Sequence, residues 1–273
     1  MWFKAILAGV ALLACGAAVA EEAPLSTSGL SRWKLTLPVD VNGDGKADEV
    51  TSLWGYRNSP WFHATPDGIV FRAHAGGART SGNTAYARSE LREMDEAGRL
   101  AAWDCLQDKR SLTLEQTLLA STTAKPEVTI GQIHDAKNDN LMLKYIGPAK
   151  ANGRSDTGRI ELQWSDSAQR DILDKAYALG QPMQVRIAAD QGTLRVIYRN
   201  LASGLEKRVS AQLDVASIVG ACYFKAGVYI QACSRIDSDG KPNVACAKKA
   251  WADARYDAPE AYAELLVRRI DLK

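Results

Sequence analysis

The sequence predicts an all-β fold, an antiparallel β-jelly roll sandwich in which one curved sheet forms a concave groove. Many short segments alternate apolar and polar side chains, which is the period of a strand with one buried face. Turn signals such as Asp190-Gln191-Gly192 and Ala202-Ser203-Gly204 separate these segments, and few segments have a helical period. Antiparallel sheets can bury one face and leave the other in water, which suits a sandwich of this kind.

The expected elements follow the chain in order. A strand is predicted at 33–38, where the alternation stops at a proline. Further strands are expected near 61–63, 69–74, 86–92, 111–121, 127–134, 141–146, 159–164, 184–190, 193–199, 206–213, 222–232 and 264–272. Two short helices are expected at 167–178 and within 247–256. This pattern indicates one large β domain over residues 30–273.

The first twenty residues predict a secretory signal peptide. Lys4 precedes an apolar run, and Ala18-Val19-Ala20 is a small-residue cleavage signal. The apolar run is too short to span a membrane. Leu12-Leu13-Ala14-Cys15 also resembles a lipoprotein box, so a lipid anchor at Cys15 stays open beside simple export. We therefore expect a secreted or periplasmic protein without a membrane span, and residues 21–29 should form a flexible start.

The charge of the chain is nearly balanced. The formal net charge is +2, and without the leader, which holds Lys4 and no acidic residue, 33 basic and 32 acidic side chains remain. No bulk positive field therefore attracts nucleic acid, and we expect no nucleic-acid partner. Any polyanionic ligand must be bound by local charges.

Four cysteines follow the leader, and an even count in an exported chain indicates disulfides. Cys222 and Cys233 bracket one alternating strand, which places them roughly 36 Å apart at the rise of a strand. A disulfide requires Cα atoms within about 7 Å, so these two should not pair. Cys233 with Cys246 closes a turn-rich segment, which leaves Cys105 with Cys222.

Three strands carry unusually polar faces. One face of 223–231 holds Tyr223, Lys225, Gly227, Tyr229 and Gln231. One face of 86–92 holds Tyr86, Arg88, Glu90 and Arg92, and one face of 130–134 holds Gln132 and His134. A cation between two phenols is not typical of a solvated strand, and we expect these faces to line a binding groove.

The motifs R-S-E-L-R at 88–92, Q-I-H at 132–134 and Y-F-K-A-G-V-Y-I-Q at 223–231 together resemble the three signature blocks of the alginate lyases of polysaccharide lyase family 7. The resemblance implies a β-jelly roll that cleaves the 1,4-glycosidic bonds of alginate by β-elimination and leaves 4,5-unsaturated uronate ends. It also implies that the catalytic set is Arg88, Gln132, His134 and Tyr229. The isoleucine within Q-I-H favours guluronate-containing blocks.

The residue types suit that chemistry. Arg88 and Gln132 can neutralise the uronate carboxylate, because guanidinium binds planar oxyanions through two donors. His134 can act as a base near neutral pH, and Tyr229 can protonate the leaving oxygen. We expect the flanking sugars to contact Glu90, Arg92, Tyr223, Lys225 and Gln231. We expect a monomer that uses no cofactor and no metal.

Two other functions and one ion site remain open at this stage. The same strand faces suit a non-catalytic carbohydrate-binding jelly roll. A glycoside hydrolase of similar fold needs two facing carboxyl groups, and Glu90 offers only one of them. The D-x-N-x-D-G spacing in 40–49 resembles a calcium loop, but Thr51 stands where an EF-hand has its bidentate glutamate.

Overall fold

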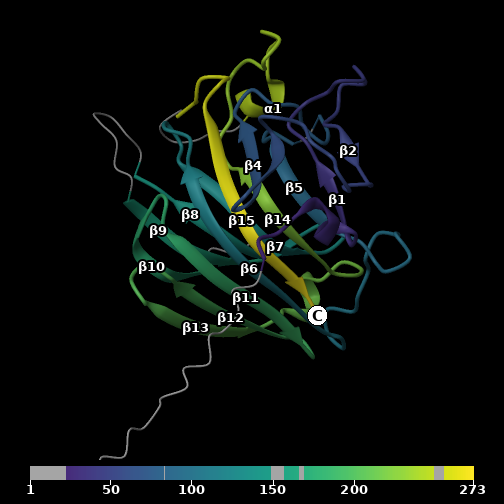
Figure 1. Cartoon of the computed structure of the whole chain (residues 1–273), viewed down its shortest axis with the longest axis vertical. Coiled ribbons are helices and arrows are strands. Elements are labelled where there is room, and N and C mark those ends of the chain that lie inside the picture. Colours follow the sequence, from purple (N-terminus) through teal and green to yellow (C-terminus); the bar gives the residue numbers. More distant parts are fainter. Residues whose placement is uncertain (1–22, 83, 149–156, 166–168, 249–254) are drawn as a thin grey trace, which may run out of the picture.

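Two antiparallel sheets stack face to face in the computed structural model, which describes residues 23–82, 84–148, 157–165, 169–248 and 255–273 (Figure 1). The first sheet has eight strands in the order β10-β9-β8-β7-β14-β5-β1-β2, and the second has seven in the order β13-β12-β11-β6-β15-β4-β3. This arrangement confirms the expected antiparallel sandwich.

The strand bounds agree closely with the alternating segments of the sequence. The eight-stranded sheet contains β1 (Trp33–Thr36), β2 (Glu49–Val50), β5 (Arg88–Glu93), β7 (Glu127–His134), β8 (Asp139–Ile146), β9 (Thr157–Trp164), β10 (Arg170–Ala178) and β14 (Tyr223–Ile230). The seven-stranded sheet contains β3 (Phe62–Thr65), β4 (Gly68–His74), β6 (Lys109–Ala120), β11 (Pro182–Asp190), β12 (Thr193–Asn200), β13 (Glu206–Gln212) and β15 (Tyr262–Leu272). Short helical turns are η1 (Thr27–Leu30), η2 (Val215–Ser217) and α1 (Val244–Ala247).

The helix expected at 167–178 was wrong, because its described part from residue 170 onward is strand β10. The pairing of β10 with β9 shifts register between Ile172 and Asp174 and again before Tyr177. These irregularities bury Leu173, Asp174 and Tyr177 out of strict alternation, a spacing that resembles a helical face. Strand pairing therefore overrides the local pattern.

The second expected helix, within 247–256, agrees with the structure only where α1 ends at Ala247. Residues 249–254 lie outside the described residues. At the other end of the described chain, the described part of segment 21–29 contacts the rest of the protein. The Leu25 N–H donates a hydrogen bond to the Arg268 carbonyl oxygen at 2.7 Å, and η1 begins at Thr27. None of the helices in the described part of the chain is long and apolar enough to cross a membrane.

The core lies between the two sheets and is built from the inward face of every long strand. Phe224, Ala226 and Val228 of β14 are completely buried, and so are apolar side chains on the inward face of the other sheet. Burying each large apolar side chain stabilises the fold by roughly 1.5–3 kcal/mol. The opposite face of β14 is thereby fixed toward the outside of the sandwich.

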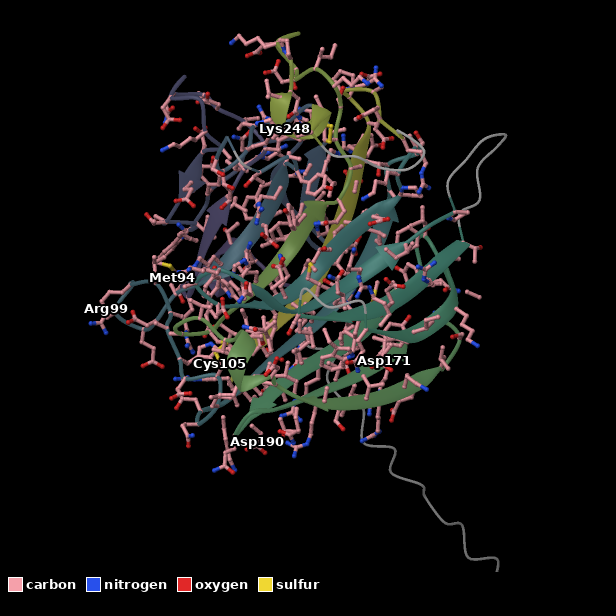
Figure 2. All side chains as sticks on the ribbon, turned by 180° about the vertical axis from the view of Figure 1, so that it is seen from behind. Met94, Arg99, Cys105, Asp171, Asp190 and Lys248 are labelled. Atoms are coloured by element: carbon pink, nitrogen blue, oxygen red, sulfur yellow. A yellow bond between two sulfur atoms is a disulfide. The ribbon has the colours of Figure 1, made fainter. Side chains whose placement is uncertain are left out.

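Two disulfides connect Cys105 with Cys222 and Cys233 with Cys246, with Cα–Cα distances of 5.4 and 6.0 Å. This confirms the pairing expected from the length of the strand between Cys222 and Cys233. The bridges lie at opposite ends of the molecule, one near Cys105 and one near Lys248 (Figure 2). One therefore fixes the entry to β14 and the other fixes the segment that follows it.

Candidate active site

Strands β5, β14, β7 and β8 are neighbours, and their registers bring the three sequence motifs onto one surface. Lys225 lies between Arg92 and Gln132. Two residues before Lys225, Tyr223 pairs with His134, and four residues after it, Tyr229 pairs with Arg88. We call this outer surface of the eight-stranded sheet the polar face, comprising Tyr86, Arg88, Glu90, Arg92, Gln132, His134, Asp139, Tyr223, Lys225 and Tyr229.

Glu90 is the centre of the polar face and is only 2% exposed. Its Oε2 lies 2.5 Å from Lys225 Nζ and 3.0 Å from Arg88 Nη1. Gln132 Nε2 donates a hydrogen bond to Oε1 of the same carboxylate. Glu90 was expected to contact the flanking sugars. The structure surrounds it with Arg88, Lys225 and Gln132, so it holds these groups together.

The charges in this cluster are set by burial and by one another. Burial opposes ionisation of Glu90, but Lys225 and Arg88 outweigh it and lower the pKa of that carboxyl group. Burial, aided by the charge of Arg88, lowers the pKa of Lys225 to about 8. Burial disfavours the charged form of Arg88, but the Glu90 carboxylate outweighs this effect and raises the pKa of the guanidinium. The face thus carries two buried cations and one buried anion.

Tyr229 lies directly under a guanidinium, with Arg88 Cζ 3.8 Å above the centre of its ring. Burial is the largest influence on its phenol and raises the pKa, while Arg88 acts against this shift. Lys225 does not set this pKa, because burial dominates and the cation that acts against it is Arg88. A phenol that keeps its proton is suited to give it to a leaving group.

His134 has a defined tautomer in this arrangement. Its Nδ1 lies within hydrogen-bonding distance of the Asp135 carbonyl oxygen, which can only accept, so Nδ1 carries the proton. The lone pair is therefore on Nε2, which lies 3.5 Å from Asp139 Oδ1. The Asp139 carboxylate thus faces the ring nitrogen that is opposite the Asp135 contact. The same carboxylate also acts on Tyr229, where it raises the pKa.

Asp139 was missed by the sequence analysis, although the sequence contained a signal for it. It begins β8 directly after the turn that follows His134, and the two residues are paired across the hairpin. A short turn between two alternating strands places the residues on either side of it opposite each other. Reading 127–146 as one hairpin would have added Asp139 to the candidate site.

Tyr223 and Arg92 form a second aromatic–cation pair, with Arg92 Cζ 3.8 Å from the ring centre of Tyr223. Tyr223 also stacks on His134 at 5.4 Å, and its hydroxyl lies 3.2 Å from His134 Nδ1. Gln231 lies just beyond β14 and hydrogen-bonds Tyr229. The structure therefore brings the residues of all three motifs together.

Several buried polar atoms on this face have no hydrogen-bond partner among the described residues. They are Arg88 Nε, Arg92 Nη1 and Gln132 Oε1. Buried polar groups are nearly always paired, so unpaired ones call for a ligand or water. Two of the three belong to guanidinium groups, which indicates that an anion completes the site.

Gly227 permits the close approach of β14 and β5 beneath this cluster. Its φ is +128°, and a Cβ atom there would lie 2.6 Å from the Ser89 carbonyl oxygen and 3.0 Å from Glu90 Cα. The absence of a side chain at position 227 therefore supports the site, because any side chain there would push Glu90 away from Lys225.

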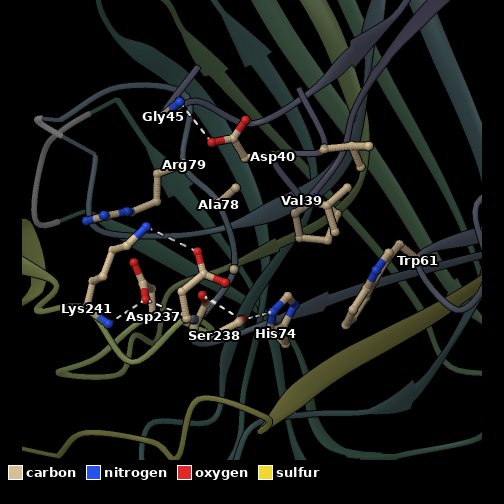
Figure 3. Close-up of a pocket in the computed structure, with 15 residues that line it drawn as sticks. Val39, Asp40, Gly45, Trp61, His74, Ala78, Arg79, Asp237, Ser238 and Lys241 are labelled. Atoms are coloured by element: carbon tan, nitrogen blue, oxygen red, sulfur yellow. Dashed lines mark hydrogen bonds and ion pairs between the residues drawn. The ribbon is translucent and has the colours of Figure 1, made fainter. Parts of the chain in front are cut away.

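His63 and His74 lie away from the polar face, on β3 and β4 of the seven-stranded sheet. His74 Nε2 lies 2.7 Å from Ser238 Oγ, and the ring stacks on Trp61 at 4.3 Å beside a cavity of about 440 Å³ (Figure 3). Burial lowers the pKa of His74 to about 4, so it stays neutral. Across this cavity Asp40 accepts a hydrogen bond from the Gly45 N–H at 2.8 Å, as Figure 3 also shows.

Segment 40–49 is a turn stabilised by its own side chains. Asp40, Asn42 and Asp44 all accept hydrogen bonds from backbone N–H groups within the segment. Within the described ranges, no group of three or more His, Cys, Asp or Glu side chains is arranged to hold a metal ion. The geometry is that of an Asn/Asp/Gly turn.

Comparison with known proteins finds relatives of this chain. The family model described as alginate lyase matches residues 28–271. An alginate lyase from Klebsiella pneumoniae is 30% identical over 289 residues, which covers 87% of this chain and 92% of that protein.

Solved structures of alginate lyases have the same fold. The alginate lyase AlgAT5 from polysaccharide lyase family 7 superposes with a TM-score of 0.69 at 28% identity, over 89% of this chain and 94% of that one. An alginate lyase from Pseudomonas aeruginosa gives a TM-score of 0.67 at 25% identity, over 89% and 98% of the two chains. From the match of the family model and this degree of identity, the chain belongs to the alginate lyases of polysaccharide lyase family 7.

Proposed function

We propose that this chain is an exported enzyme that cleaves the 1,4-glycosidic bonds of alginate by β-elimination on the polar face. The observation that carries the proposal is the contact between Arg88 and Tyr229, at 3.8 Å from Cζ to the ring centre. A group that binds a carboxylate and a group that donates a proton are thereby held side by side. β-Elimination from a uronate needs both within one sugar of each other.

The reaction begins with neutralisation of the uronate carboxylate. Arg88 and Lys225 supply positive charge, and Gln132 has a second N–H beyond the one given to Glu90. This stabilises the charge that develops on the carboxylate when the neighbouring C5–H bond breaks. The low polarity of a buried site strengthens these interactions relative to water.

Proton transfer follows at C5 and O4. His134 Nε2 takes the C5 proton of a guluronate, and the electron pair forms the C4=C5 double bond as the C4–O4 bond breaks. Tyr229 gives its proton to O4, so the leaving sugar departs as an alcohol. For mannuronate, whose C5 proton has the opposite orientation, Tyr229 acts in its phenolate form, which the Arg88 charge favours: it takes the C5 proton and then gives that proton to O4. Water then restores the protonation of both side chains.

The preference for guluronate rests on the Q-I-H motif. Ile133 is completely buried on the core side of β7, so it does not reach the substrate. Its effect on preference would act through the positions of Gln132 and His134 on either side. We propose guluronate-containing blocks as the better substrate on this basis.

The rival functions fit the charges less well. A glycoside hydrolase needs a carboxyl group that keeps a proton, whereas Lys225 and Arg88 lower the pKa of Glu90 despite its burial. A binding module has no need for a histidine whose Nε2 faces a carboxylate, as that of His134 does. The two disulfides support export, and the segment with the A-x-A signal would direct it.

The test is digestion of purified polyguluronate and polymannuronate with product sizing. Elimination creates a conjugated double bond that absorbs ultraviolet light, whereas hydrolysis or simple binding creates none. We expect ultraviolet absorbance to rise on both polymers and faster on polyguluronate. Shortening of the polymer without new absorbance would refute elimination and favour a hydrolase, and an unchanged polymer would favour a binding module.

A further inference from the structure

Four arginines surround one isoleucine on the outer face of the seven-stranded sheet, on the side of the sandwich opposite the polar face (Figure 1). Ile197 of β12 pairs with Arg186 of β11 on one side and with Arg208 of β13 on the other. Arg195 and Arg199 lie two positions before and after Ile197, so they share its face. We call this surface the arginine face, comprising Arg186, Arg195, Ile197, Arg199 and Arg208.

The carboxylates on this face do not balance the arginines. Glu206 holds two of them, Arg199 and Arg208, each at 2.6 Å. Asp190 holds Arg195 at 2.9 Å. Arg186 is exposed and forms no ion pair with any residue that the structure describes. In a chain whose overall charge is nearly balanced, this is a local surplus of positive charge.

The surface around Arg186 is hollowed rather than flat. Two cavities, of about 420 and 410 Å³, are both lined by Arg186, Ile197 and Lys273. Because they share these three residues, the two cavities adjoin along the strands. Arg195 lines the first and Arg199 lines the second, so the hollow follows β12 with a cation at each end.

We propose that the arginine face is a second, non-catalytic binding site for an anionic polysaccharide of the class that the polar face cleaves. Guanidinium groups bind carboxylates through two parallel hydrogen bonds and keep their charge at any physiological pH. Ile197 offers an apolar contact for the C–H groups of a sugar ring between the charged positions. A polymer with one carboxylate per sugar suits repeated cations along a strand.

The proposal rests on the proposed function for the identity of the polymer. A nucleic acid is the less suitable polyanion, because the chain has almost no net charge to attract it. Alginate gains from the second site, since one chain held at the arginine face raises its effective concentration near the polar face. The second site therefore benefits long polymers and not short fragments.

The experiment uses the double variant Arg186→Ala/Arg208→Ala. It leaves Glu206 paired with Arg199 and Asp190 paired with Arg195, so no carboxylate loses all of its partners. The matched control is Arg99→Ala/Lys241→Ala, which removes two cations whose side chains are 80% and 74% exposed. Affinity for long alginate and for an alginate tetrasaccharide is measured by calorimetry with Tyr229→Phe in every protein, which slows turnover at least about a hundredfold.

We expect the double variant to bind long alginate at least about threefold more weakly than the control, with unchanged affinity for the tetrasaccharide. The difference should vanish near 1 M salt, where the screening length is about 3 Å. Equal affinity of variant and control for long alginate at low salt would overturn the proposal. So would an equal loss for the tetrasaccharide, which would place the effect at the polar face.

Two further measurements complete the experiment, one on the identity of the ligand and one on the proposed function. If a DNA oligomer binds the parent protein and loses affinity in the variant while alginate does not, the face is a nucleic-acid site and the proposal is wrong. Without Tyr229→Phe, the parent protein is also assayed for ultraviolet absorbance on alginate. Absent absorbance there refutes the proposed function, whereas normal absorbance with no effect of Arg186→Ala/Arg208→Ala refutes only the second site.

Discussion

Two glutamates on opposite sides of the sandwich each hold two cations, and only one of them is buried. Glu90 is 2% exposed and contacts Arg88 and Lys225, whereas Glu206 is 36% exposed and contacts Arg199 and Arg208. The same residue types thus make the same kind of cluster in two environments. Water screens the exposed cluster, and the buried one is desolvated.

The difference teaches that burial converts an ion cluster into a chemical site. On the polar face burial lowers the pKa of Lys225, raises that of Tyr229 and leaves donors without partners, while the ion pairs outweigh burial at Glu90 and Arg88. On the arginine face the cations remain ordinary surface charges. The first arrangement can stabilise charge in a reaction, and the second can only bind.

The two ion clusters should differ most in stability when the glutamate of each is replaced. Glu90→Ala leaves two buried cations without their anion and should cost about 3–5 kcal/mol in the free energy of unfolding. Glu206→Ala should leave stability unchanged within error, because its arginines stay in water. Urea denaturation of both variants measures this. Equal denaturation midpoints would show that burial does not separate the two clusters.

Tyr229→Phe should reduce turnover on alginate by at least about a hundredfold, because a positioned proton donor contributes about that much or more. Polymer affinity should survive, since Arg88 and Gln132 remain. Tyr223→Phe is the matched control on the same strand, six residues away. Initial rates from ultraviolet absorbance, with titrated affinities, decide between them. A dead Tyr223→Phe enzyme beside a nearly normal Tyr229→Phe enzyme would reverse the assignment of the acid.

His134→Ala should lose most activity on polyguluronate, about a hundredfold, because no other group on the face is assigned to the C5 proton. The fold should persist, since the side chain is 22% exposed and lies on the outer surface. The check is the rate on polyguluronate together with the urea midpoint. Turnover close to that of the parent enzyme would remove His134 from the mechanism.

The pH dependence should report Lys225, whose pKa burial lowers to about 8. Activity should fall severalfold as pH rises through about 8, when the ammonium loses its charge. Lys225→Arg keeps the charge and should remove that alkaline decline. An unchanged decline in Lys225→Arg would assign it to another group.

The same shift has a consequence for stability. Between pH 8 and the ordinary value of 10.5 the unfolded chain binds more protons at Lys225 than the folded chain does. The contribution of this residue to stability therefore rises with pH across that window and is unfavourable below it. Urea midpoints at pH 7 and pH 10 measure this rise, and Lys225→Met should reduce it.

Much of the fold and of the candidate site could be predicted from the sequence. Period-two alternation located the strands, and the length of one strand excluded a bridge between Cys222 and Cys233. Strand pairing is not a local property of the sequence, so β10 was mistaken for a helix. Asp139 was missed although the hairpin over 127–146 indicates it. Burial could not be read either. The alternation put Glu90 on the outer face correctly, but only the registers of β5, β14 and β7 reveal that three side chains enclose it.

Gly227 limits how this active site can diversify. Its left-handed backbone and the Ser89 carbonyl at 2.6 Å from any added Cβ exclude every other residue. Position 227 lies in the middle of the strand that carries both tyrosines and Lys225. A lineage under selection for a new uronate must therefore vary the loops and the outer rows of the polar face. Position 227, at the centre of that face, offers it no alternative residue.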